Sequence, residues 1–114
     1  MYEYNAKVLS VYDGDTIRVD LDLGFGIWMR NQSIRFTGID TPELRGDSKE
    51  AGIASRDRLI ELLTQADNKC VIKTTKDNQR GKWGRILGEI WVDTQPISIN
   101  NILLNEGLAV QYLK

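Results

Sequence analysis

The chain has 114 residues, of which 41% are apolar and 27% charged, with a net charge of −1; these values fit one soluble globular domain over residues 1–114 and exclude a disordered or membrane-spanning chain. It contains no histidine and one cysteine, which excludes an internal disulfide, a zinc site of Cys and His ligands and His-dependent catalysis. Any metal must therefore be held by oxygen ligands, which favours calcium, magnesium or manganese.

The first part of the chain is predicted to be β-rich. Alternating apolar residues and turn signals indicate three strands, at residues 3–12, 16–23 and about 27–39, the last interrupted near residues 31–32. Pro42 ends this region because proline cannot donate a hydrogen bond to a strand ladder.

A helix is predicted next, capped by Asp47 or Ser48 and ending near Ala66. Its apolar stripe is expected to comprise Ile53, Leu59, Ile60, Leu62 and Leu63. Two more strands are expected, around residues 70–76 and 85–92, with Cys70 buried in the core. A second, short helix is expected to start at Ser98, bury Ile99, Ile102 and Leu103, and end at Gly107.

The order of these elements predicts an α+β fold that is mainly β. We expect one antiparallel sheet that closes as a five-stranded Greek-key barrel of the OB type. A helix would lie between the third and fourth strands, and a short helix near the C-terminus.

Three segments carry residues suited to phosphate chemistry. Asp13-Gly14-Asp15-Thr16 can ligate a hard cation, although the same residues form ordinary turns. Asp40-Thr41-Pro42-Glu43 places two more carboxylates at a strand end, five residues after Arg35. Lys82-Trp83-Gly84-Arg85 is either a basic hairpin or a phosphate-binding loop. Together, the segments supply the groups that phosphodiester hydrolysis requires: metal ligands, arginines for developing charge, and a base for water.

These segments, with Arg35-Phe36-Thr37-Gly38-Ile39 and Asn105-Glu106-Gly107-Leu108-Ala109, resemble the staphylococcal nuclease family along nearly the whole chain. The resemblance implies an OB-fold and calcium-dependent hydrolysis of DNA and RNA. It also implies roles for single residues. Asp15, Asp40 and the Thr41 carbonyl would bind Ca²⁺, with Asp13 as a nearby acidic support. Arg35 and Arg85 would grip the scissile phosphate, and Glu43 would act as the general base or position the water. Lys82, Trp83 and Tyr112 would contact the substrate.

The sequence departs from the family in several places. The segment from Asp20 to Ser33 is longer and includes Trp28, which either packs within the protein or stacks on a base. Only Tyr112 stands where the family carries paired tyrosines. The chain stops before the family's final helix, so we expect a monomer, or a dimer that compensates for the missing contacts. The main alternative function is a noncatalytic OB module that binds nucleic acid or peptide.

The N-terminus has no basic segment leading into an apolar one. We therefore expect either a cytoplasmic protein or a trimmed secreted form, with no membrane association.

Overall fold

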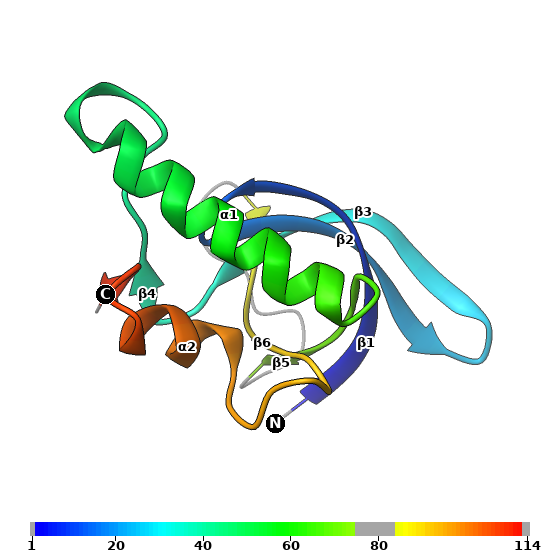
Figure 1. Ribbon diagram of the computed structural model, residues 1–114. Coiled ribbons are helices and arrows are strands. Elements are labelled where there is room, and N and C mark those ends of the chain that lie inside the picture. Colours follow the sequence, from blue (N-terminus) through cyan, green and yellow to red (C-terminus); the bar gives the residue numbers. More distant parts are fainter. Residues whose placement is uncertain (1, 75–83, 113–114) are drawn as a thin grey trace.

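The fold of the chain is a closed β-barrel with two helices packed against it (Figure 1). The computed structural model describes residues 2–74 and 84–112. The barrel strands are β1 (Tyr2–Asp13), β2 (Thr16–Gly24), β3 (Ile27–Phe36), β6 (Ile86–Trp91) and β5 (Lys69–Thr74), in that order around the ring. A separate two-stranded sheet pairs β4 (Ile39–Asp40) with β7 (Val110–Gln111).

The expectation of a purely antiparallel sheet was wrong. Four of the five neighbouring strand pairs are antiparallel, but β3 and β6 are parallel, with Ile34 opposite Ile86 and Phe36 opposite Gly88. Strand directions cannot alternate all the way round a closed ring with an odd number of members, so closing five strands requires one parallel pair. The OB-type barrel, with α1 between its third and fourth strands, is otherwise as predicted.

The third strand ends earlier than predicted. It was expected to continue to Ile39, but the chain turns at Gly38, whose φ of 79° lies in the left-handed region that glycine tolerates. Ile39 and Asp40 therefore leave the barrel and pair with Gln111 and Val110. The turn between β3 and β4 is important for the site because Arg35 and Asp40 lie on either side of it.

The helix α1 (Lys49–Gln65) follows a short 3-10 turn, η1 (Gly46–Ser48). Ser48 occupies the N-cap position, but its side chain makes no capping hydrogen bond. The helix buries Leu59, Leu62 and Leu63 with two small residues, Gly52 and Ser55. Ile60, expected in the apolar stripe, is instead 41% exposed.

The second helix, α2 (Ile99–Asn105), is built as predicted. The Ser98 side chain accepts a hydrogen bond from the amide of Asn101 at 3.1 Å, and Gly107 has a φ of 74° after the last turn.

Cys70 is buried, and burial raises the pKa of its thiol to about 12. The core unites barrel and helices; its fully buried large side chains are Phe36, Ile17, Ile34, Ile39, Leu59, Leu62, Leu63, Ile72, Ile90, Ile99, Leu103 and Val19.

The hairpin of β2 and β3 projects away from the barrel (Figure 1). Its tip contains Phe25, which is fully exposed and has a φ of 56°. Trp28 is 39% exposed, with the Arg30 guanidinium 5.0 Å from its ring centre. No helix in the described part of the chain is long and apolar enough to cross a bilayer.

Candidate active site

The turn between β1 and β2 points its acidic residues toward β4. Asp15 is buried, and its Oδ2 accepts a hydrogen bond from the amide of Thr41 at 3.0 Å. Its Oδ1 accepts a second one from the Thr16 hydroxyl at 3.2 Å. Asp13 closes the turn on itself, since its Oδ1 accepts from the Asp15 amide at 3.1 Å. Two segments that are 26 residues apart in the sequence therefore meet at one carboxylate.

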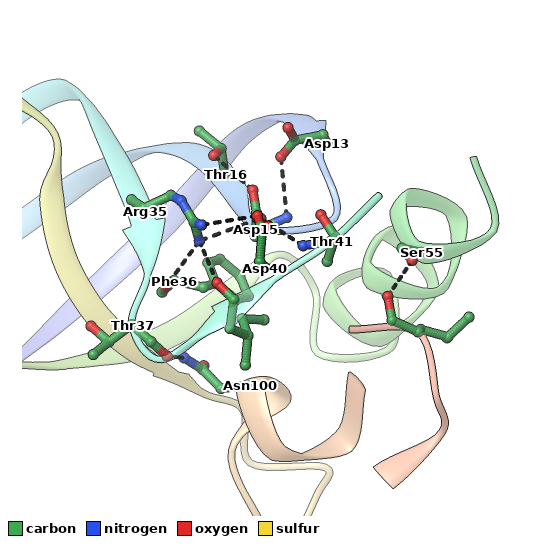
Figure 2. A network of polar contacts seen from close by, with 12 residues as sticks. Asp13, Asp15, Thr16, Arg35, Phe36, Thr37, Asp40, Thr41, Ser55 and Asn100 are labelled. Carbon is green, nitrogen blue, oxygen red and sulfur yellow. Dashed lines mark hydrogen bonds and ion pairs between the residues drawn. The ribbon is translucent and has the colours of Figure 1, made fainter. Parts of the chain in front are cut away.

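Arg35 lies between the two acidic segments (Figure 2). Its Nη1 is 3.3 Å from Oδ2 of Asp15, and its Nη2 is 3.4 Å from Oδ1 of Asp40. Nη1 also donates to the carbonyls of Phe36 and Ile39, both at 2.9 Å. The guanidinium is therefore fixed along one edge by backbone oxygens, while the contact of its Nη2 with Asp40 is long.

The aromatic ring of Tyr112, near the C-terminus, lies next to the Arg35 guanidinium. The centre of its ring is 5.7 Å from Cζ of Arg35, within the range of a cation–π interaction. Its amide donates to the Gly38 carbonyl at 2.9 Å, and the pairing of β7 with β4 places Val110 opposite Asp40. The aromatic ring predicted to contact substrate thus lies beside the predicted phosphate ligand.

The group as a whole has an excess of negative charge. Asp13, Asp15 and Asp40 are three carboxylates beside one guanidinium. The pKa of Asp13 is raised to about 6, chiefly by burial and also by the hydrogen bond and charge of the Asp15 side chain, against opposing effects of the Asp15 amide and Arg35.

Glu43 lies apart from this network. Its side chain is exposed and pairs with Arg45, Oε2 to Nε at 3.1 Å. Glu43 and Asp13 nevertheless face the same open cleft of about 320 Å³, whose other walls are Tyr12, Leu44 and Arg45. Two acidic side chains therefore line one cleft that is open to water.

Arg85 approaches from β6. It directly precedes this strand, and Leu87, two residues further, pairs with Arg35 across the parallel β3–β6 ladder. Side chains two residues apart on a strand lie on one face, so a continuation of β6 by one residue would put Arg85 on the same face of the barrel as Leu87 and Arg35. Nε of Arg85 is buried and has no hydrogen-bond partner among the described residues. Lys82 and Trp83 lie outside the described residues.

The donor atoms suit a hard divalent cation. Asp15 and Asp40 both contact Arg35, and the Thr41 amide is bonded to Asp15, so the predicted ligands are neighbours. Within the part of the chain that the structure describes, the Thr41 hydroxyl is also buried and has no hydrogen-bond partner. Within residues 2–74 and 84–112, no three acidic, His or Cys side chains form a ready metal cluster. Two carboxylates would therefore leave most of the coordination sphere to backbone oxygens and water, which calcium and magnesium accept.

Comparison with known proteins identifies the family of this chain. The model of the family described as staphylococcal nuclease homologue matches residues 33–114, which include Arg35, Asp40, Glu43 and Arg85. The chain belongs to this family. The fold and the predicted family membership are therefore both confirmed.

Three bacterial relatives of this staphylococcal nuclease homologue are nucleases by name. The thermonuclease of Staphylococcus hyicus is 31% identical over 107 residues, 94% of this chain and 59% of the relative. Endonuclease YncB of Bacillus subtilis is 30% identical over 108 residues, 92% of this chain and 46% of the relative. The SPbeta prophage-derived endonuclease YokF of Bacillus subtilis is 32% identical over 100 residues, 85% of this chain and 30% of the relative. The chain thus spans about three fifths or less of the length of these relatives.

Two buried polar residues that hold segments near the site were not predicted from the sequence. Asn100 is buried in α2, and its Nδ2 donates to the Thr37 carbonyl at 2.8 Å in the β3–β4 turn. Ser55 is buried in α1, and its hydroxyl donates to the Leu108 carbonyl at 2.5 Å (Figure 2). A polar residue inside an apolar helical stripe is the signal that could have identified both.

Proposed function

We propose that this staphylococcal nuclease homologue is a calcium-dependent nuclease that hydrolyses phosphodiester bonds of DNA and RNA by attack of water. The observation that carries the proposal is the position of Arg35 between Asp15 and Asp40, within 3.4 Å of both carboxylates. Two carboxylates that can bind a cation lie beside a guanidinium that can bind a phosphate. Both groups would stabilise the negative charge that develops on the oxygens of a phosphodiester during hydrolysis.

Ca²⁺ would be held by Asp15, Asp40 and the Thr41 carbonyl, with Asp13 adding negative charge behind Asp15. When bound, the cation would supply electrostatic stabilisation to the negative oxygens of the phosphate. The excess of carboxylates over cationic groups and the oxygen-only donors support this assignment.

Arg35 and Arg85 would bind the scissile phosphate. Nη1 of Arg35 is held by two backbone carbonyls, which fixes the plane of its guanidinium. The long contact between Nη2 and Asp40 leaves that edge able to donate to a phosphate oxygen. Nε of Arg85 is buried and, in the described part of the chain, has no hydrogen-bond partner, which supports a role in binding an anionic group.

Glu43 would take the proton of the attacking water as general base, or hold that water in line with the phosphorus. Its carboxylate faces an open cleft, where both water and substrate can enter. The ion pair with Arg45 is between exposed side chains, so separating it costs about 1 kcal/mol or less. Tyr112 beside Arg35, with Lys82 and Trp83, would contact the nucleotide around the scissile phosphate.

The test is cleavage of labelled single-stranded DNA and RNA with calcium, followed by excess chelator. We expect cleavage that stops on chelation. Arg35→Ala and Glu43→Ala should each lower the rate by about 10² or more. Arg18→Ala and Glu50→Ala are matched controls, since both residues are exposed and neither lines the cleft.

The results separate the nuclease from a noncatalytic OB module. Binding of single-stranded DNA without cleavage under any divalent ion would favour the binding module and refute the enzyme. Cleavage that survives Arg35→Ala would refute the role of Arg35 alone.

A further inference from the structure

The interior of α1 contains a glycine that its backbone does not require. Gly52 is buried and helical, and it is not among the residues with positive φ. Glycine destabilises a helix interior relative to alanine. A glycine with no conformational reason for being there indicates that another part of the chain comes too close for a side chain.

That part of the chain is the backbone of the Pro42–Glu43 segment. A Cβ at position 52 would lie 2.5 Å from the Glu43 carbonyl oxygen, 2.8 Å from the Pro42 carbonyl oxygen and 2.9 Å from the Glu43 carbonyl carbon. Carbon–oxygen contacts in proteins are ordinarily about 3.3 Å or longer. Because all three atoms are backbone, no rotamer change relieves the clash, and helix and turn would have to separate by about 0.8 Å.

The Glu43 carbonyl is also held from a second direction. The Ser48 hydroxyl lies 2.9 Å from it and 3.0 Å from the Arg45 carbonyl oxygen, and its one hydrogen is shared between these two acceptors. Gly52 therefore forms the surface against which the Glu43 backbone rests, and Ser48 supplies the hydrogen bond that keeps it there.

The same face of α1 also supports the other acidic turn. One turn along the helix, the Ser55 Cβ would be 2.8 Å from a Cβ built on Gly14, which lies between Asp13 and Asp15. The two sides of the cleft that Asp13 and Glu43 line are thus packed on neighbouring positions of one helix.

We propose that Gly52 is a positioning residue for Glu43: its missing side chain lets the Pro42–Glu43 backbone pack directly on α1, which sets the distance of the Glu43 carboxylate from the phosphate site. This inference rests on the role proposed above for Glu43. Displacements near 1 Å in an active site can lower rates about 10²-fold, so a shift of about 0.8 Å is large enough to matter.

The test is a double-mutant cycle of Gly52→Ala and Glu43→Ala on single-stranded DNA with calcium. We expect Gly52→Ala to lower kcat about 10- to 100-fold and to leave KM within about twofold, because both phosphate-binding arginines are untouched. In the Glu43→Ala background the same substitution should change kcat less than about twofold, since the residue it displaces is already gone.

Stability provides an independent readout, measured by urea unfolding without calcium. Helix propensity alone predicts that Gly52→Ala raises the urea midpoint, whereas the contact with Glu43 predicts that the midpoint falls. Ala54→Gly, at an exposed position of the same helix, is the matched control: it should lower the midpoint and leave kcat unchanged. If Gly52→Ala does not fold, Ser48→Ala replaces it in the cycle, with an expected loss of kcat of about threefold or more, again absent without Glu43.

The outcomes distinguish this inference from the proposed function. A wild-type protein that does not cleave refutes the proposed function, and a Glu43→Ala variant that cleaves normally refutes the role proposed there for Glu43. If both behave as expected, the inference is overturned by a Gly52→Ala variant with normal kcat. It is equally overturned if the full loss persists in the Glu43→Ala background.

Discussion

Asn100 connects three parts of the fold, and its replacement by alanine should be costly. Its Oδ1 accepts from the Ile90 amide at 3.0 Å, and its Nδ2 donates to the Thr37 carbonyl at 2.8 Å. The side chain therefore ties α2 to β6 and to the turn between β3 and β4. This turn links the strand of Arg35 to that of Asp40, so the hydrogen bonds of Asn100 also hold the candidate site in place.

The expected loss follows from what each partner would face. The Ile90 amide is buried, so leaving it unpaired costs about 1–3 kcal/mol. Thr37 is exposed and its carbonyl can bond to water, so that bond contributes only about 0.5–1.5 kcal/mol. Together the terms predict that Asn100→Ala lowers the free energy of unfolding by about 3 kcal/mol, enough to be measured in a domain stable by about 5–15 kcal/mol.

The neighbouring Asn101 is a matched control in the same helix. It is exposed, and the hydrogen bond that caps α2 uses its amide rather than its side chain. Asn101→Ala should change stability by no more than about 0.5 kcal/mol. Urea unfolding followed by tryptophan fluorescence measures both variants. A loss below about 1 kcal/mol in Asn100→Ala, or equal losses in the two, would show that the buried amide finds another partner and refute the reasoning.

Three further predictions concern single side chains away from the site. Cys70 should not react with a thiol reagent in the native protein, because burial raises the pKa of its thiol to about 12; rapid native labelling in the Ellman assay would contradict this. Glu106 accepts two hydrogen bonds from Arg58, at 2.8 and 2.9 Å, and these lower the pKa of Glu106. Its ionised form therefore adds stability above its ordinary pKa that is lost as the pH falls through the lowered value. Glu106→Gln should thus cost about 1 kcal/mol at neutral pH and nothing in strong acid, in urea titrations across pH; a pH-independent loss would exclude the ion pair as the cause. Phe25→Asn should raise stability by about 0.5–1 kcal/mol, since Asn tolerates the left-handed backbone and the exposed ring loses no packing; a fall in thermal scans would mean that the ring has a partner.

The helices and strands were predictable because each depends on a pattern of residues that lie close together in the sequence. The alternation from Thr16 to Leu23 has the period of a strand, and the structure forms β2 there. Ser98 and Gly107 carry capping chemistry within a few residues of each other, so the limits of α2 were predicted closely. Ile60 shows where such patterns become ambiguous. It lies at the edge of the apolar face of α1, and Leu59 and Leu63 are buried in its place.

Pairings between distant residues were not predictable in this way. The short strands β4 and β7 have two residues each and no period of their own, so their partnership depends on the turn at Gly38 and on the position of α2. The parallel contact of β3 with β6 follows from closing the ring and not from any residue in either strand. Tyr112 reaches Arg35 only because β7 pairs with β4.

The candidate site combines both kinds of information. The absence of histidine implies that any bound metal would have oxygen ligands, and Arg35 contacts both Asp15 and Asp40 in the structure. Glu43 differs, because a motif fixes which residue follows Pro42 but not where its carboxylate points. In the structure its carboxylate pairs with Arg45, while Ser48 and Gly52 contact its backbone; none of the three is acidic or belongs to the motif. Under the roles proposed above, the motif supplies the carboxylate of this position, while the packing of α1 beneath it would set the distance of that carboxylate from the phosphate.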